Sequence, residues 1–231
     1  MSFLAQESLS EQIAQHLANQ IIRGESLAGD RIQELRIASE LEVSRGSVRE
    51  ALLILERRHL IDILPRRGAV VKDMSEAHVR SLYELTQVLL GLVVRKAIKV
   101  MREDDLDPFI ATIHDLQMRL DERDVDAFFN ASFRFLELAY PFSRNPFVED
   151  IMTNLQPAVQ RAYYMALHID PEEMKECLSF FKAIIETIFR RDVRSALEII
   201  REFAEHQSTL VQESLVRARQ IEVAWGARRK R

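Results

Sequence analysis

Five small or basic residues stand close together near the start of the chain: Ser44, Arg45, Gly46, Ser47 and Arg49. An arginine guanidinium can form two parallel hydrogen bonds with guanine, and a serine hydroxyl suits bases or phosphates. A glycine lets the backbone approach a ligand closely. These residue types therefore predict contacts with the base edges and phosphates of DNA.

The apolar pattern around these residues predicts two short helices joined by a tight turn. Ile37, Ala38 and Leu41 recur at helical spacing, and Glu42-Val43 forms the turn. Ser44 is a suitable N-cap for the second helix. The buried stripe expected for that helix consists of Val48, Ala51, Leu52 and Leu55. With the stripe turned inward, the five small or basic residues lie where a recognition helix faces the major groove.

Two short apolar segments, Leu60–Leu64 and Ala69–Val71, predict a two-stranded ribbon with a basic turn between the strands. The turn contains Arg66, Arg67 and Gly68, a composition typical of a wing that contacts phosphates or the minor groove. The alternative interpretation is ordinary solvated arginines. The position of the turn, directly after the recognition helix, favours the wing.

Composition sets the broad class of the protein. The chain has 231 residues and a net charge of −4, and its 47% hydrophobic and 29% charged residues are globular values. Basic residues outnumber acidic ones locally, from Arg45 to Lys72. The single cysteine, Cys177, cannot form an intrachain disulfide, and no secretory signal or membrane-spanning run is visible. We therefore expect a cytoplasmic protein, nucleoid-associated when bound to DNA, with no membrane partner.

The remaining pattern is helical. Ser8 and Glu11 have capping-box spacing before a helix that Gly24 ends. After the short joint before Ser75, six or seven amphipathic helices are expected, separated by breaks that carry Pro or Asp, and Pro157 should kink a helix or mark a join. The breaks are Asp107-Pro108, Asp124-Val-Asp126, Ser143-Arg-Asn-Pro146, Asp170-Pro171 and Arg191-Asp192. We predict a mainly α fold with a winged helix-turn-helix domain over residues 1–73, an all-α helical bundle over 74–222, and a basic tail over 223–231.

The segment Val43–Leu52, followed by Pro65–Gly68 and Val71, closely resembles the winged helix of GntR-superfamily transcription regulators over about Leu9 to Val71. The resemblance implies a dimeric, sequence-specific regulator of transcription that binds a palindromic operator. Many relatives carry an arginine directly after the glutamate that opens the second helix. Here that place holds Leu35, and Arg36 beside it is the candidate base contact.

Two later stretches resemble the FadR branch of this superfamily. Leu82–Arg95 resembles the first helix of its C-terminal domain, and Phe133–Phe135 with Asn145-Pro146 resembles its central helix and the following turn. The resemblance implies a helical domain that binds an effector and dimerises.

Many bundles of this branch hold a divalent metal with one aspartate and three histidines. This chain has Ser132, Leu136, Phe181 and Phe203 at the corresponding positions. Leucine and phenylalanine cannot ligate a metal, and the remaining histidines are scattered: His78, His114, His168 and His206. We therefore expect no metal and no cofactor.

The effector site is the least determined feature. Thr86 and Leu90 stand where carboxylate-sensing relatives commonly have arginine and glutamate. These replacements favour a hydrophobic effector, such as a fatty acyl group or an aromatic compound. The candidate pocket residues are Thr86, Leu90, Leu136, Arg161, Tyr164, Phe181 and Phe203, and polar groups that could orient an effector are Arg95, Arg161, Tyr163 and Tyr164.

The alternative is that the phenylalanines fill the core, because aromatic residues at helical spacing commonly pack. The two resulting hypotheses are an effector-controlled regulator and a constitutive DNA-binding or dimerisation protein. An enzyme is not expected, because the chain shows no nucleophile–base constellation, no phosphate loop and no set of metal ligands.

Overall fold

The computed structural model describes residues 8–229, and the side chains of residues 8–217. The chain divides into two compact units. The first runs to Met74 and takes in Asn154–Arg161 from later in the chain. The second contains Ser75–Thr153 and the chain from Ala162 onward.

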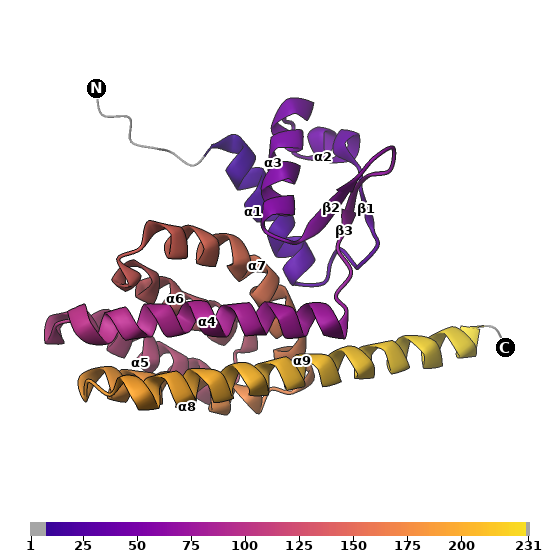
Figure 1. Cartoon of the computed structure of the whole chain (residues 1–231). Helices are drawn as coiled ribbons and strands as arrows, with labels where there is room; N and C mark the ends of the chain where they lie inside the picture. Colours follow the sequence, from indigo (N-terminus) through magenta and orange to yellow (C-terminus); the bar gives the residue numbers. More distant parts are fainter. Residues whose placement is uncertain (1–7, 230–231) are drawn as a thin grey trace, which may run out of the picture. The chain divides into compact units, whose positions relative to one another are not determined.

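The first unit combines three helices with a small antiparallel sheet (Figure 1). Its elements are α1 (Leu9–Ile22), β1 (Arg31–Ile32), α2 (Glu34–Glu40), α3 (Arg45–Arg57), β2 (Ile61–Leu64) and β3 (Gly68–Val71). The strand order is β1-β3-β2, with Ile63 opposite Ala69 and Arg31 opposite Val70. The predicted winged helix-turn-helix is confirmed. The sequence prediction missed β1, because a two-residue strand is too short to show alternation.

Local capping and burial explain the helices of the first unit. The Ser8 hydroxyl accepts a hydrogen bond from the Glu11 amide at 3.1 Å, as the capping spacing predicted. At the other end of α1, Gly24 has a φ of +75°, a conformation that glycine adopts without strain. The buried stripe of α3 is the predicted one: Val48, Ala51, Leu52 and Leu55. This stripe holds α3 against α1 and leaves the opposite face of α3 to solvent.

The described residues of the second unit form helices joined by short connections, and none of them forms a strand. Its elements are α4 (Glu76–Val100), the 3₁₀ helices η1 (Glu103–Leu106) and η2 (Tyr140–Ser143), α5 (Asp107–Glu122), α6 (Val125–Ala139), α7 (Pro146–Ile169), α8 (Glu173–Phe189) and α9 (Val193–Arg229). Helix α7 also supplies the segment that belongs to the first unit. Among the described residues, six α-helices follow Ser75, which matches the predicted six or seven. The side chains of Ser75, Asp124, Asn145 and Asp192 each accept a backbone hydrogen bond at a helix start. Pro157 lies inside α7, which remains helical through it.

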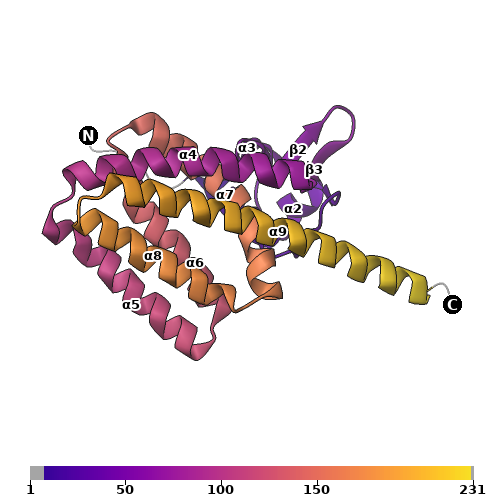
Figure 2. The ribbon, with the colours of Figure 1, turned by 60° about the horizontal axis from the view of Figure 1, so that its bottom comes forward.

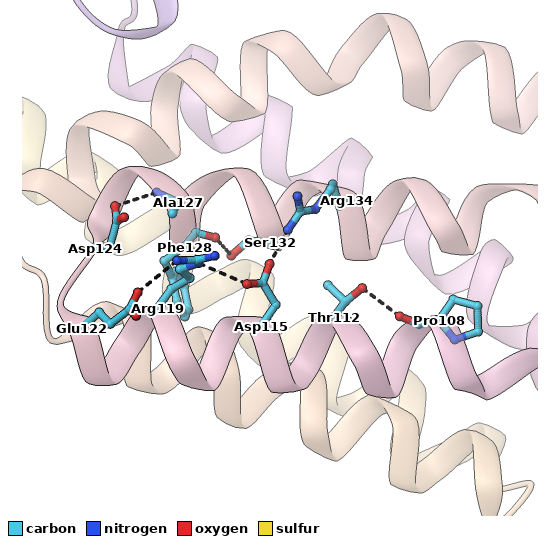
Figure 3. Close-up of polar contacts among 10 residues, drawn as sticks. All are labelled: Pro108, Thr112, Asp115, Arg119, Glu122, Asp124, Ala127, Phe128, Ser132 and Arg134. Carbon is cyan, nitrogen blue, oxygen red and sulfur yellow. Dashed lines mark hydrogen bonds and ion pairs between the residues drawn. The ribbon is translucent and has the colours of Figure 1, made fainter.

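Helices α4 and α9 lie side by side in both views, and α5 packs against α6 and α8 (Figures 1 and 2). A polar network joins α5 to α6 (Figure 3). The carboxylate of Asp115 accepts hydrogen bonds from Arg119 of α5, at 3.1 Å, and from Arg134 of α6. The hydroxyl of Ser132 donates to the Phe128 carbonyl at 2.9 Å, so it is satisfied within α6.

Within the described residues, no helix is both long and apolar enough to cross a membrane. The expected basic tail over 223–231 falls where side chains are outside the described residues, although the backbone of α9 is helical as far as Arg229.

Candidate nucleic-acid interface

The start of α3 presents two arginines to solvent. Ser44 caps the helix by accepting a hydrogen bond from the Ser47 amide at 3.0 Å, and the two hydroxyls lie 2.9 Å apart. The side chains of Arg45 and Arg49 are 56% and 64% exposed, and neither belongs to the buried stripe. The packed face of α3 therefore fixes the backbone, while the two guanidinium groups project from it.

A single carboxylate links these arginines. The Oε2 atom of Glu34, the first residue of α2, lies 2.9 Å from the Nε of Arg49 and 3.9 Å from a terminal nitrogen of Arg45. Ion pairs this exposed contribute at most about 1 kcal/mol. A guanine edge or a phosphate can therefore displace Glu34 at little cost. We call Glu34, Arg45 and Arg49 the arginine cluster.

The wing turn carries the other exposed cations. Arg66 and Arg67 are exposed, and neither guanidinium has a hydrogen bond or ion pair within the part of the chain that is described. Positive φ angles of 65° at Arg66 and 76° at Gly68 shape the turn. The Nε of Arg31 in β1 donates to the Arg67 carbonyl at 2.7 Å, which braces the turn from the third strand.

Nearby acidic side chains are engaged elsewhere. Glu50 accepts a hydrogen bond from the Ser10 hydroxyl at 2.6 Å, Glu56 accepts from the Ile63 amide at 3.0 Å, and Asp62 pairs with Lys72 at 3.3 Å. These partners partly neutralise the three acidic side chains, and none of the partners is Arg45 or Arg49. The first unit offers a locally basic surface although the whole chain has a net charge of −4.

Two further candidates are placed differently. Arg36 is exposed on α2 and pairs with Glu40 at 3.4 Å, so it does not join the arginine cluster. A Cβ atom built on Gly46 would meet only the Ser44 hydroxyl, at 3.6 Å, which is an ordinary contact. The fold therefore does not require glycine at position 46, and its expected role in close approach to DNA stays a prediction.

The candidate effector residues of the helical domain do not gather around one space. Leu90 and Leu136 line an apolar cavity of about 40 Å³. The Thr86 hydroxyl donates to the Leu82 carbonyl at 2.8 Å, and the Tyr164 hydroxyl donates to Asp126 at 3.0 Å.

Two other polar candidates also lie away from the cavity. Arg161 falls in the first unit, where it donates to the Lys72 carbonyl at 2.6 Å. Burial lowers the pKa of Arg161, and the nearby Asp73 acts in the opposite direction. Arg95 is exposed.

Four phenylalanines fill the space beside this cavity. The ring centroids of Phe135 and Phe181 are 4.2 Å apart, and the stacked rings of Phe180 and Phe203 are 3.9 Å apart. Phe180 and Phe181 are also in contact, with centroids 5.3 Å apart. We call Phe135, Phe180, Phe181 and Phe203 the aromatic cluster. Among the described residues, no three histidine, cysteine or acidic side chains are grouped so that they could hold a metal ion.

The sequence did not identify Glu34 and Arg31 as residues of the candidate interface. Glu34 opens the second helix and reads as an ordinary acidic residue at a helix start, where it is favourable in any protein. Only the spatial approach of α2 to α3 reveals its contact with both arginines. The sequence does not indicate a role for Arg31. Its hydrogen bond to the wing turn depends on the pairing of β1 with β3, and the residues around Arg31 do not predict that pairing.

Comparison with known proteins covers both units. Residues 9–71 match the family described as bacterial regulatory proteins, gntR family, and residues 81–206 match the FCD domain. The chain is 26% identical over 212 residues to the HTH-type transcriptional repressor RspR of Escherichia coli strain K12, covering 87% of this chain and 93% of that protein. It is also 26% identical over 178 residues to the gluconate operon transcriptional repressor of Bacillus subtilis, covering 75% and 71%.

Solved structures share the fold. The Escherichia coli McbR/YncC structure superposes with a TM-score of 0.78 at 19% identity, covering 91% of this chain and 100% of that one. A GntR transcriptional regulator from Rhodococcus sp. RHA1 gives a TM-score of 0.68 at 17% identity, covering 87% and 96%.

Proposed function

Given that this chain belongs to the gntR family of DNA-binding transcriptional regulators and carries an FCD domain, we propose that it binds a palindromic operator as a homodimer. The observation that carries the proposal is the arginine cluster at the exposed start of α3, followed by the basic wing. A helix packed on one face and carrying two exposed guanidinium forks on the other suits guanine contacts in the major groove.

Selection from random DNA followed by titration tests this proposal. We expect enrichment of a palindrome whose two half-sites are separated by about one helical turn, roughly 34–36 Å. Recovery of sequences with no shared motif, bound no more tightly than random DNA, would contradict sequence-specific operator binding.

A face of α4 supports the homodimer. Leu85, Val88 and Leu92 are large apolar side chains exposed to solvent, and their spacing places them on one side of the helix. A two-fold pair of regulators requires a patch that binds its own copy. Such a stripe on the helical unit meets that requirement, and it lies outside the candidate DNA contacts.

Replacement of Val88 by glutamate tests the α4 face. We expect Val88→Glu to shift the dimer toward monomer in analytical ultracentrifugation and to weaken operator binding, because one half-site alone provides less affinity. Leu27→Glu, at an exposed apolar side chain of the first unit, is the matched control. An unchanged sedimentation coefficient for Val88→Glu would remove α4 from the dimer interface.

For the helical domain, packing supports the filled-pocket alternative over a hydrophobic effector. The apolar cavity of about 40 Å³ has room for roughly one water-sized group, whereas a cavity that binds benzene measures about 150 Å³. The aromatic cluster occupies the adjoining space. Acyl-CoAs, fatty acids and aromatic acids should therefore leave the melting temperature unchanged. A dose-dependent rise would restore the hydrophobic effector.

The helical domain is further proposed to work without a metal. Ser132 is satisfied within its own helix, and the side chains of Leu136, Phe181 and Phe203 have no donor atom for a metal. Elemental analysis of protein purified without a metal-affinity column tests this. Stoichiometric zinc, nickel or manganese would overturn it.

A further inference from the structure

The Arg67 residue of the wing turn is held by two hydrogen bonds to its backbone. Its amide donates to the Leu64 carbonyl at 3.1 Å, which closes the turn between β2 and β3. Its carbonyl accepts from the Nε of Arg31 at 2.7 Å. The first bond lies within the turn, whereas the second comes from β1, 36 residues earlier in the chain. The orientation of the wing turn therefore depends on a residue outside it.

The backbone of the wing turn has an unfavourable conformation at one residue. Arg66 has a φ of +65°, in the left-handed region. This region carries a steric cost for a residue with a Cβ atom, and such a residue stays there only when surrounding contacts hold it. Leu64 and Gly68, on either side, are already paired in the sheet. The hydrogen bond from Arg31 thus acts on the segment between them, where the sheet gives no support.

Strand β1 can serve as an anchor because its own position is fixed by β3. Arg31 lies opposite Val70 in this pairing. Just before β1, the Val71 amide donates to the Asp30 carbonyl and the Gly29 amide donates to the Val71 carbonyl, each at 2.9 Å. Strand β1 lies beside β3, on the side away from β2 (Figure 1). Arg31 is therefore held at its backbone and reaches the wing turn with its side chain.

Arg31 also differs from the other exposed arginines near the candidate interface. The two arginines of the arginine cluster share one carboxylate, and Arg36 pairs with Glu40. The Nε of Arg31 donates instead to an uncharged carbonyl, and no carboxylate pairs with Arg31 in the part of the chain that the structure describes. Its positive charge is therefore not neutralised by an ion pair, and its hydrogen bond is made to the wing turn.

We propose that Arg31 is a positioning residue for DNA binding, which acts through the Arg67 carbonyl to hold the wing turn in its binding orientation. The inference rests on the proposed contact between the wing and DNA. A wing that is already oriented meets phosphates without first being ordered, and the apparent affinity falls with the fraction of molecules whose wing is in that orientation. Arg31 thus contributes to affinity without touching DNA.

Operator titration of Arg31→Ala gives the first test. We expect the affinity for operator and for random DNA to fall by about threefold or more, as for a wing that is in its binding orientation about a third of the time or less. The melting temperature should stay close to that of the wild type, because Arg31 is exposed. Arg57→Ala, which removes an exposed cation from the end of α3, is the matched control and should change the affinity little.

A double-mutant cycle separates positioning from a direct contact with DNA. In a protein that already carries Arg66→Ala and Arg67→Ala, the side chains that Arg31 would position are absent. Adding Arg31→Ala to this background should therefore change the affinity by less than about twofold. A direct attraction between Arg31 and phosphates would give the same loss in both backgrounds.

Two further measurements address the hydrogen bond itself. Arg31→Lys keeps a charge and a donor on a long stem and should restore most of the affinity, whereas Arg31→Met has a similar stem without a donor and should behave like Arg31→Ala. In nuclear magnetic resonance relaxation without DNA, Arg31→Ala should lower the order parameters of the Arg67 and Gly68 amides. The Ile61 amide, at the far end of β2, should keep its order parameter.

Three results would overturn the inference: an equal loss of affinity in both backgrounds, wild-type affinity of Arg31→Ala while the double wing variant binds more weakly, or unchanged order parameters at Arg67 and Gly68. Each of these leaves the proposed operator binding intact. Wild-type affinity of the double wing variant is a different failure. It would remove the wing from the proposed DNA contacts, and the role of Arg31 with it.

Discussion

The start of α3 and the interior of the helical domain use their side chains in opposite ways. Arg45 and Arg49 project into solvent from a helix whose other face is packed, so their chemistry is available to a partner. Phe180 and Phe181 are buried in their own domain, where their rings contact each other and Phe180 stacks on Phe203. A binding surface can therefore be inferred from the residue types on one helix. An internal pocket depends instead on the space that the side chains of the neighbouring helices leave unfilled.

The same contrast separates the electrostatics of the two regions. Arg45 and Arg49 are exposed and weakly paired, so a ligand can exchange with Glu34 at small cost. The polar atoms inside the second unit are fixed, and an unpaired oxygen there is costly. DNA affinity should consequently depend on salt, while the stability of the helical domain should depend on packing.

The largest effect is expected from the aromatic cluster. Phe181 is 2% exposed and Phe189, on the same helix, is 65% exposed. Phe181→Ala should lower the free energy of unfolding by about 3–5 kcal/mol, because it removes a packed ring and leaves a cavity. Phe189→Ala should change it by less than about 0.5 kcal/mol. Urea denaturation measures both, and equal effects would mean that the cluster is not tightly packed.

The arginines of α3 should give the next largest effect. Arg45→Ala and Arg49→Ala should each reduce the discrimination between operator and random DNA by about 1–3 kcal/mol for each base that is no longer read. Stability should not change, because neither side chain packs in the buried stripe. Arg57→Ala, at the exposed end of the same helix, is the control. Fluorescence anisotropy with both DNAs measures the ratio, and wild-type discrimination would exclude that arginine from reading bases.

The wing should affect affinity without affecting sequence preference. Replacing Arg66 and Arg67 together by alanine should weaken operator and random DNA about equally. The slope of log K against log salt should become flatter by about one for each phosphate that an arginine no longer neutralises. Titration at several salt concentrations measures the slope. An unchanged slope would exclude the wing from binding phosphates.

Gly46→Ala tests whether glycine at position 46 is needed for folding or for DNA binding. Gly46→Ala should fold normally, since its added methyl group meets only an ordinary contact. Operator binding should fall by roughly tenfold, about 1.4 kcal/mol, if the backbone must approach DNA closely. Circular dichroism and operator titration make the comparison. Wild-type affinity would show that close approach at this position is not needed.

The smallest effect is expected at Glu34. Glu34→Gln should strengthen binding to random DNA by up to about 1 kcal/mol, because a competing carboxylate is removed from the arginine cluster. The operator should gain less, since Arg45 and Arg49 are no longer held in place. The measured ratio of the two affinities should therefore fall. Glu40→Gln, whose partner Arg36 lies outside the cluster, should leave the ratio unchanged.

The sequence alone determined the winged helix, its capped recognition helix and the helical character of the second unit. Each depends on local signals that survive without tertiary information: Ser8, Ser44 and Ser75 as N-caps, and a buried stripe at helical spacing. Such signals arise from hydrogen bonds and periodicity within a few residues.

Tertiary structure alone decided the partners of the functional side chains. The contact of Glu34 with two arginines, the strand that includes Arg31, and the filling of the bundle by phenylalanines all join residues distant along the chain. The buried oxygens of Tyr83 and Gln207, which have no hydrogen-bond partner among the described residues, follow the same rule. Whether a buried polar atom is satisfied depends on every helix that surrounds it, and no spacing within one helix contains that information.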